Sequence, residues 1–311
     1  MKIVFFGSSR ASLHCLQLLS SSGLAVELII TQPDRKAGRG KKITQNPLKK
    51  YALENNTPIL QPHKIRKSPE TLGKIKQIKP DLNVIVSYGQ FIPSSIIYLP
   101  KYNSINLHFS LLPKYRGASP VQWAILKGEE KTGVSIFELN KNMDEGPVYS
   151  QKEVPIQADE NTAELESRLA HIGAELLITT INKIPGLKLR PQDHAKATYA
   201  PLIKKQDGKI CWENNAISIY RQARAFYPWP STFTFLQDKR LKIIKGKPFD
   251  KKSGLNYQPG EIIEINRMGI KVCCGDSNSY LIEELQPENK KEMSAYAFSL
   301  GAKLQTRDIF S

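Results

Sequence analysis

Three polar side chains in the middle of the chain have the types and spacing to act on one reacting atom. Asn106 and His108 lie two residues apart at the end of an apolar run, residues 104–108. Side chains of a β-strand alternate between its two faces, so we expect this pair to project to the same side. Asp144 follows in a turn, residues 142–147, that contains Gly and Pro. We therefore predict that an amide, an imidazole and a carboxylate converge.

This combination suits the transfer of an acyl group to an amine. Such a reaction passes through a tetrahedral carbon whose oxygen gains negative charge, and an amide N–H and a protonated imidazole are good donors for that charge. Asp144 beside His108 would favour the imidazolium and orient its ring. An amine is itself a nucleophile, so no covalent intermediate is needed. Ser110 lacks a general base of its own, which favours loop structure or a substrate contact for it.

The surrounding elements predict an open, mostly parallel α/β sheet. Apolar runs typical of strands alternate with helical periodicity, and strands are expected at residues 2–6, 25–31, 81–89, 104–108 and 133–137. Pro113 and Gly117 end the strand that carries Asn106 and His108, which places the pair at a strand exit, where such sheets bind ligands. Only Gly7 stands where a dinucleotide fingerprint needs three spaced glycines, so the first turn is interpreted as structural and not as an NAD site.

The second part of the chain has a different pattern. A long helical stretch, residues 162–184, is followed by residues with several prolines and no steady periodicity. Five short strands come next, at residues 232–236, 241–244, 260–265, 270–274 and 280–285, and this pattern is typical of a small OB-like β-barrel. We therefore expect a Rossmann-like domain at residues 1–186, a linker at 187–205 and the barrel domain at 206–311.

Composition disfavours several classes of protein. The 311 residues carry a net charge of +16, which favours nucleic acid as a partner before an anionic membrane. Four cysteines without Cys-x-x-Cys spacing indicate neither a disulfide framework nor a common zinc site, and the histidines lack metal-ligand spacing. No signal peptide or membrane-spanning apolar run is recognisable. We expect a cytoplasmic monomer that uses no metal and does not bind a membrane.

The stretch from Asn106 to Asp144 resembles the formyl-tetrahydrofolate-dependent formyltransferases. It carries their Asn-x-His, a Ser-Leu-Leu-Pro at residues 110–113 and the distant Asp, and the similarity continues through residues 224–230 and 290–294. The resemblance implies formyl transfer from 10-formyl-tetrahydrofolate, with Asn106, His108 and Asp144 catalytic. It also implies a folate pocket lined by Ser110, Leu111, Leu112, Pro113, Val86, Tyr88, Gly89 and Gln90.

The basic segments favour one branch of this family. Two glycines among the cations of residues 32–51 make a loop that can adapt to a phosphate backbone. The resemblance implies that this loop contacts the acceptor arm of initiator methionyl-tRNA. The expected tRNA contacts are Arg39, Lys41 and Lys42 in the loop, and Lys204, Lys205, Arg221 and Arg224 near the start of the barrel domain.

Alternatives remain open from the sequence. A sugar-nucleotide formyltransferase would keep the catalytic trio, although the basic loop and the cationic barrel domain favour tRNA. A non-catalytic RNA-binding protein would have the same two domains, with Asn106, His108 and Asp144 present but without a catalytic role. None of these three positions departs from the family's pattern, however. Sheet core is the alternative for Val86, loop packing for Leu111 to Pro113, and ordinary solvated charge for each basic residue.

Overall fold

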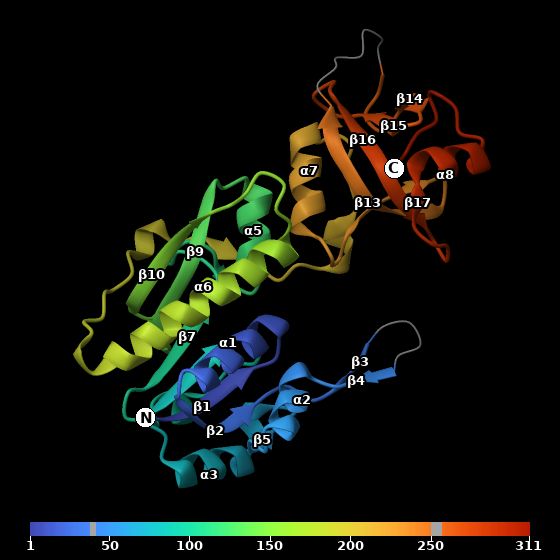
Figure 1. Cartoon of the computed structure of the whole chain (residues 1–311). Helices are drawn as coiled ribbons and strands as arrows, with labels where there is room; N and C mark the ends of the chain where they lie inside the picture. The colour runs from blue at the N-terminus through green and yellow to red at the C-terminus, as the bar shows by residue number, and fades with distance from the viewer. Residues whose placement is uncertain (38–41, 250–256) are drawn as a thin grey trace. The chain divides into compact units, whose positions relative to one another are not determined.

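The computed structural model describes residues 1–37, 42–249 and 257–311, and the chain divides into two compact units (Figure 1). The first unit comprises Met1–Pro120, Glu130–Ile156 and Leu165–Pro201, and the second comprises Val121–Glu129, Gln157–Glu164 and Leu202–Ser311. The chain therefore passes between the units several times. The domain boundaries expected from the sequence stay a prediction.

A seven-stranded sheet forms the centre of the first unit. Its strand order is β10-β9-β7-β6-β1-β2-β5, and the neighbours from β7 to β5 run parallel while β9 and β10 are antiparallel. The strands are β1 (Lys2–Gly7), β2 (Ala25–Ile30), β5 (Ile59–Leu60), β6 (Leu82–Val86), β7 (Ser104–His108), β9 (Lys131–Glu138) and β10 (Val148–Pro155). The predicted mostly parallel, Rossmann-like sheet is confirmed.

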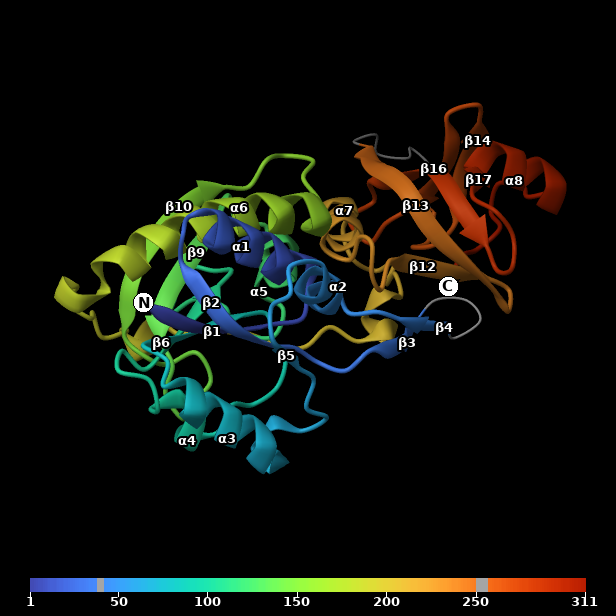
Figure 2. The ribbon, with the colours of Figure 1, turned by 60° about the horizontal axis from the view of Figure 1, so that its bottom comes forward.

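Helices cover both faces of this sheet, with α1 and α6 on one side and α3 and α4 on the other (Figure 2). The helices are α1 (Arg10–Ser21), α2 (Pro47–Glu54), α3 (Pro69–Ile78), α4 (Ser94–Ile97) and α6 (Thr162–Lys183). Val4 and Phe6 of β1 pack in one cluster with Ile75 of α3 and Ile96 of α4. Because both faces are covered, β1 is a continuous apolar run without polar alternation.

The turn between β1 and α1 is shaped by packing. Ser9 caps α1, since its side chain accepts a hydrogen bond from the Ser12 N–H at 3.1 Å and Ser12 Oγ accepts one from the Ser9 N–H at 2.7 Å. A Cβ atom on Gly7 would lie 2.6 Å from the Cβ of Ser12. Glycine is needed there because the helix approaches the strand so closely.

The second unit is a small antiparallel β-barrel. Its strands are β12 (Thr232–Leu236), β13 (Lys239–Phe249), β14 (Ile262–Asn266), β15 (Gly269–Cys273), β16 (Ser279–Pro287) and β17 (Met293–Ser294). In the order β12-β13-β16-β15-β14, β12 and β14 are the two edges, and β17 pairs with β16. Phe310 bridges to Leu236 of β12, and Ile309 bridges to Glu261 beside β14. The C-terminal residues thus connect the two edges, and the predicted barrel is confirmed.

Three helices also belong wholly or mostly to the second unit, and two of them, α7 and α8, contact strands of the barrel. The helices are α5 (Pro120–Lys127), α7 (Ala216–Ala225) and α8 (Ala295–Ala302). Trp212, Tyr280 and Phe310 fill the core, and the indole N–H of Trp212 donates to Thr234 Oγ1 at 3.0 Å. A buried indole therefore keeps a hydrogen-bond partner inside the barrel.

Short elements complete the described chain. In the first unit, β3 (Arg35–Ala37) pairs with β4 (Lys42–Thr44) as an antiparallel hairpin, and β8 (Arg116–Gly117) pairs in parallel with β11 (Tyr199–Ala200). The 3-10 helices are Ile65–Lys67, Ile184–Gly186, His194–Lys196 and Lys205–Gly208. Within residues 1–37, 42–249 and 257–311, no helix has the length and apolar character to cross a membrane.

Candidate active site

Strand β7 presents Asn106 and His108 on one face at its carboxyl end. Leu107 between them packs on the other face against Gly173 of α6, where an added Cβ atom would lie 2.9 Å from the leucine side chain. Pairing with β9 sets the register, because Asn106 lies opposite Phe137. The alternation of the strand therefore turns the amide and the imidazole to the same side.

Asp144 reaches His108 from the loop that follows β9. Its Oδ2 lies 3.7 Å from His108 Nδ1 and accepts a hydrogen bond of 2.8 Å from the Gly117 N–H. The two side chains are only 7 % and 13 % exposed. The φ angle of Asp144 is 53°, a left-handed conformation in which aspartate is enriched relative to most side chains. The structure thus brings the imidazole and the carboxylate together where both are largely shielded from solvent.

Hydrogen bonding places a proton on one nitrogen of the His108 ring. Nε2 lies 2.9 Å from the carbonyl oxygen of Tyr115, which can only accept, so Nε2 carries a hydrogen. Nδ1 faces the Asp144 carboxylate at a distance too long for a hydrogen bond. An imidazolium would thus have an acceptor near each nitrogen. The side-chain amide of Asn106 has no hydrogen bond to any described residue, which leaves its donors available to a ligand.

A buried arginine lies behind the Asp144 loop. Arg116 is 1 % exposed, and its Nε and Nη2 donate to Gln192 Oε1 at 3.1 and 2.8 Å. Its Nη1 lies 3.4 Å from Glu145 Oε1. The amide nitrogen of Gln192 donates in turn to the carbonyl oxygens of Asp144 and Gly146, at 2.8 and 2.7 Å. These contacts connect the guanidinium to the backbone of the candidate carboxylate residue, Asp144, and to that of Gly146 two residues later.

Sequence reasoning missed the segment that completes this site. Residues 192–200 fall in the predicted linker, yet they contact the loop after β7. His194 Nδ1 accepts a hydrogen bond of 3.2 Å from the guanidinium of Arg116, which can only donate, and Thr198 Oγ1 accepts one of 2.8 Å from the Tyr115 N–H. The segment has no periodicity and no motif, so its sequence carries no signal of this role.

The loop residues expected to bind folate differ in exposure. Ser110 is fully buried, and its hydroxyl donates to the Lys114 carbonyl oxygen at 2.6 Å, which favours the loop-structure alternative for it. Leu112 is 5 % exposed and belongs to a small apolar cluster. Leu111 and Pro113 keep partial exposure. Of the four residues, Leu111 and Pro113 are therefore the ones that a ligand can reach.

The folate residues expected after β6 are mostly engaged within the protein. Val86 is fully buried in the strand, and the ring of Tyr88 packs against Phe6 in the core, with ring centroids 5.6 Å apart. Burial raises the pKa of Tyr88. The Gln90 side chain bonds two backbone groups of the preceding segment, at 2.9 and 3.1 Å. Gly89 is exposed, with a φ angle of 74°, and is the one of the four that is open to a ligand.

The basic loop expected to bind tRNA is only partly described. Arg39 and Lys41 lie outside the described residues. Lys42 begins β4, and its backbone pairs with that of Ala37 in the β3–β4 hairpin. The structure therefore shows the base of the loop, and the contacts of these three cations with tRNA stay a prediction.

Asp34 holds the base of this hairpin. Its carboxylate bonds Lys49 Nζ at 2.6 Å, the Asn46 N–H at 3.1 Å and Gln61 Nε2 at 3.1 Å. These hydrogen bonds, with that of Lys49 the strongest influence, lower the pKa of Asp34 to about 2. A carboxyl group whose pKa is lowered by folding stabilises the fold above its unfolded pKa, and this contribution disappears as the pH falls through the folded value.

We therefore expect Asp34→Asn to lower the melting temperature near neutral pH, and the difference from the wild-type chain to shrink as the pH falls from about 4 to about 2. Thermal unfolding followed by circular dichroism across this range is the measurement. Asp238→Asn, at an exposed turn of the second unit, is the matched control and should follow the wild-type curve. A difference for Asp34→Asn that stays constant down to pH 2 would contradict the prediction.

The four cations expected to bind tRNA in the second unit also differ in exposure. Lys204 and Lys205 are exposed, and Arg221 is partly buried. Arg224 is partly buried, and its Nη1 donates to the Ala158 carbonyl oxygen at 2.6 Å. Burial lowers the pKa of Arg224. Its guanidinium thus already has partners within the protein, while the two lysines are open to solvent.

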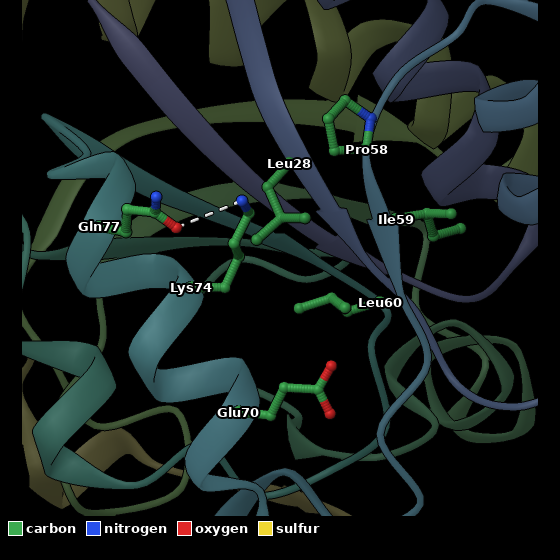
Figure 3. A pocket seen from close by; sticks show the side chains of 7 residues that line it. All are labelled: Leu28, Pro58, Ile59, Leu60, Glu70, Lys74 and Gln77. Carbon is green, nitrogen blue, oxygen red and sulfur yellow. Dashed lines mark hydrogen bonds between the residues drawn. The ribbon is translucent and has the colours of Figure 1, made fainter.

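A separate hollow of about 580 Å³ lies between α3 and the β2–β5 edge of the first sheet (Figure 3). It is lined by Leu28, Pro58, Ile59, Leu60, Glu70, Lys74 and Gln77. Lys74 and Gln77 are hydrogen bonded to each other at 3.3 Å, and none of the predicted site residues lines the hollow. Over the three described stretches of the chain, no group of three or more His, Cys, Asp or Glu side chains is arranged to hold a metal ion.

Comparison with known proteins accounts for both units. The formyl transferase family model matches residues 1–181, and the model of the formyl transferase C-terminal domain matches residues 202–303. The methionyl-tRNA formyltransferase of Alkaliphilus oremlandii is 40 % identical over 311 residues, which cover 99 % of each chain. That of Citrifermentans bemidjiense is 41 % identical over 307 residues, which cover 98 % of this chain and 95 % of the relative. The chain belongs to the methionyl-tRNA formyltransferase family.

Membership in this family makes the chain a formyl-transferring enzyme, and it disfavours the reading as a non-catalytic binding protein. Among solved structures, the sugar 3N-formyl transferase WlaRD, crystallised in the presence of dTDP and 5-N-formyl-THF, has a TM-score of 0.66 and is 21 % identical. The match covers 94 % of this chain and 99 % of that one. At this identity the likeness shows a shared fold and nothing about the acceptor.

Proposed function

We propose that this chain transfers the formyl group of 10-formyl-tetrahydrofolate to the α-amino group of initiator methionyl-tRNA. The observation that carries the proposal is the close approach of Asp144 to the buried His108, on the strand face that also carries Asn106, whose side-chain amide is not hydrogen bonded to any described residue. The names of the full-length relatives support the acceptor. A formyl-folate named with the solved sugar formyltransferase supports the donor.

The proposed chemistry is direct attack of the amine on the formyl carbon. A bond forms between the α-amino nitrogen and this carbon, and the bond from the carbon to N10 of the folate then breaks. The amine loses one proton, N10 gains one, and the formyl oxygen carries negative charge in between. A neutral α-amino group is well populated at pH 7 to 8, because its ordinary pKa is about 8. No serine or cysteine nucleophile is therefore required.

Each residue of the trio has a distinct part in this step. Asn106 and His108 donate hydrogen bonds to the developing oxyanion, and such preorganised donors act strongly in a site that excludes water. Nδ1 of His108 is suited to this, since its 3.7 Å separation from Asp144 leaves its hydrogen free to point at the substrate. Asp144 orients the imidazole, takes the proton that the amine releases and gives it to N10 as the bond from the formyl carbon to N10 breaks.

The basic residues supply affinity for the tRNA and not the chemical step. We place Arg39, Lys41 and Lys42 against the acceptor arm, and the exposed Lys204 and Lys205 against phosphates elsewhere on the tRNA. Arg221 and Arg224 remain assigned to the tRNA surface, with Arg224 the weaker candidate because its guanidinium is bonded within the protein. The protein would act as a monomer in the cytoplasm.

Arg39→Ala should raise the KM for tRNA and leave kcat at saturating tRNA unchanged. Loss of one phosphate contact should also reduce the slope of log(kcat/KM) against log salt concentration by about one. Steady-state kinetics at several salt concentrations measure both effects. Lys76→Ala removes one exposed charge from α3 and is the control, for which no change is expected. If log(kcat/KM) depends on log salt concentration with the same slope in Arg39→Ala and in the wild-type chain, Arg39 does not contact tRNA and is an ordinary solvent-exposed charge.

The proposed function is tested by the choice of acceptor. Transfer from 10-formyl-tetrahydrofolate is compared for initiator methionyl-tRNA, elongator methionyl-tRNA and an amino-sugar nucleotide. Transfer confined to the initiator tRNA is expected. Formylation of the sugar would favour a sugar-nucleotide formyltransferase, and tRNA binding without transfer would favour a binding protein on the same frame.

A further inference from the structure

The Asp144 loop is held from behind by a side chain remote in sequence. Gln192 is 8 % exposed, and its amide nitrogen donates to two carbonyl oxygens, those of Asp144 and Gly146. Its amide oxygen accepts two hydrogen bonds from the guanidinium of Arg116. Both polar atoms of the Gln192 side chain are thus hydrogen bonded. Two of the four hydrogen bonds go to the loop, one on either side of Glu145.

Contacts other than the hydrogen bonds of Gln192 also restrain the Asp144 loop. An added Cβ atom on Gly146 would lie 1.7 Å from the Glu138 carbonyl oxygen, so the backbone passes too close for any other residue. Glu145 is held by Arg116 at 3.4 Å and by the amide nitrogen of Asn142 at 2.8 Å. Asp144 itself keeps a left-handed φ angle of 53°, which must be stabilised by its surroundings.

The chemistry of the amide explains why a glutamine stands here. The two carbonyl oxygens need donors, and the buried guanidinium needs acceptors. An amide side chain supplies both at once, whereas a carboxylate could serve only the arginine and a hydrocarbon could serve neither. Glu145 supplies the negative charge that a buried guanidinium requires, which leaves the neutral amide to connect it to the loop.

We infer that Gln192, anchored by Arg116, is a positioning residue that fixes the Asp144 carboxylate at its place beside His108. This inference rests on the proposed function, since it matters only if Asp144 takes part in transfer. Displacement of a reacting group by about 1 Å can cost about 10²-fold in rate. Gln192 therefore acts on the chemical step through Asp144 and does not touch the substrates.

The test begins with Gln192→Met, which keeps the length of the side chain and removes its hydrogen bonds. We expect kcat to fall by roughly 10- to 100-fold, while the KM values for folate and tRNA change by less than about twofold. Gln192→Glu keeps an acceptor for Arg116 and removes the two donors, so it should show the same loss in a chain that folds normally. Gln222→Met is the matched control, because Gln222 also bridges two carbonyl oxygens, in the second unit, at 2.8 and 3.1 Å. Its kcat should be unchanged.

A double-mutant cycle separates positioning from a merely structural role. If Gln192 acts through Asp144, adding Gln192→Met to Asp144→Asn should lower kcat by less than about threefold further. A further loss as large as in the wild-type background would overturn the inference while leaving the proposed function intact. Wild-type rates in Asp144→Asn itself would instead overturn the role of Asp144, and the inference with it.

Discussion

His108→Ala should lower kcat/KM for formyl transfer by roughly 10³-fold or more. The loss of one preorganised oxyanion donor typically costs about 10²- to 10³-fold, and the substitution also removes the ring that Asp144 faces at 3.7 Å. The imidazole is 7 % exposed and its Nε2 is bonded to the Tyr115 carbonyl oxygen, so it is fixed in place before the substrates bind. Steady-state transfer to initiator methionyl-tRNA measures the effect.

Two companion variants make this result interpretable. His171→Ala removes an exposed imidazole that pairs with His14 and Glu175 on the first unit, and it should leave kcat/KM unchanged. His108→Asn keeps a hydrogen-bond donor near the same place and should recover part of the loss. Folding of both His108 variants is checked by thermal unfolding. A change of less than about threefold in folded His108→Ala would remove the imidazole from the mechanism.

The second large effect is expected from Asp144→Asn, which should lower kcat by about 10²-fold or more. The substitution removes the charge beside His108 and the acceptor for the proton of the amine. It keeps the shape of the side chain, and the asparagine oxygen can still accept the hydrogen bond from the Gly117 N–H. Activity should therefore fall far more than the melting temperature.

Asp238→Asn is again the control, since this aspartate lies in an exposed turn of the second unit. The kcat values of both variants are measured with saturating folate and tRNA. An Asp144→Asn protein that turns over at the wild-type rate would exclude the carboxylate from the proton transfer. If the fall in kcat comes with a large fall in the melting temperature, the role of Asp144 is structural and not catalytic.

The placement of Asn106 and His108 on one strand face was predictable from local rules. The period of two in residues 104–108 places Asn106 and His108 on one face, and the proline and glycine after them mark the strand exit. The hydrogen bonds from Gln192 to the Asp144 loop were not predictable, because they join segments 48 residues apart in the chain. No pattern along the sequence encodes such a pairing.

The binding residues show where a local pattern is insufficient. All five residues of β6 are buried, so no alternation of polar and apolar residues shows which face meets a ligand, and Tyr88 after it packs into the core. Arg224 looks like a surface cation in the sequence, yet it bonds the Ala158 carbonyl oxygen 66 residues away. The charge of a residue in the sequence does not show whether its side chain is available to bind a phosphate or is hydrogen bonded within the protein.

The most direct test of the central claim is the rate of formyl transfer in a single turnover. Enzyme in excess over initiator methionyl-tRNA and saturated with 10-formyl-tetrahydrofolate is quenched at short times, and the formyl-methionyl ester is quantified. Rates that fall by roughly 10²- to 10³-fold in His108→Ala and Asp144→Asn, with tRNA binding retained, are what direct amine attack assisted by this pair predicts. Single-turnover rates equal to that of the wild-type chain would contradict it.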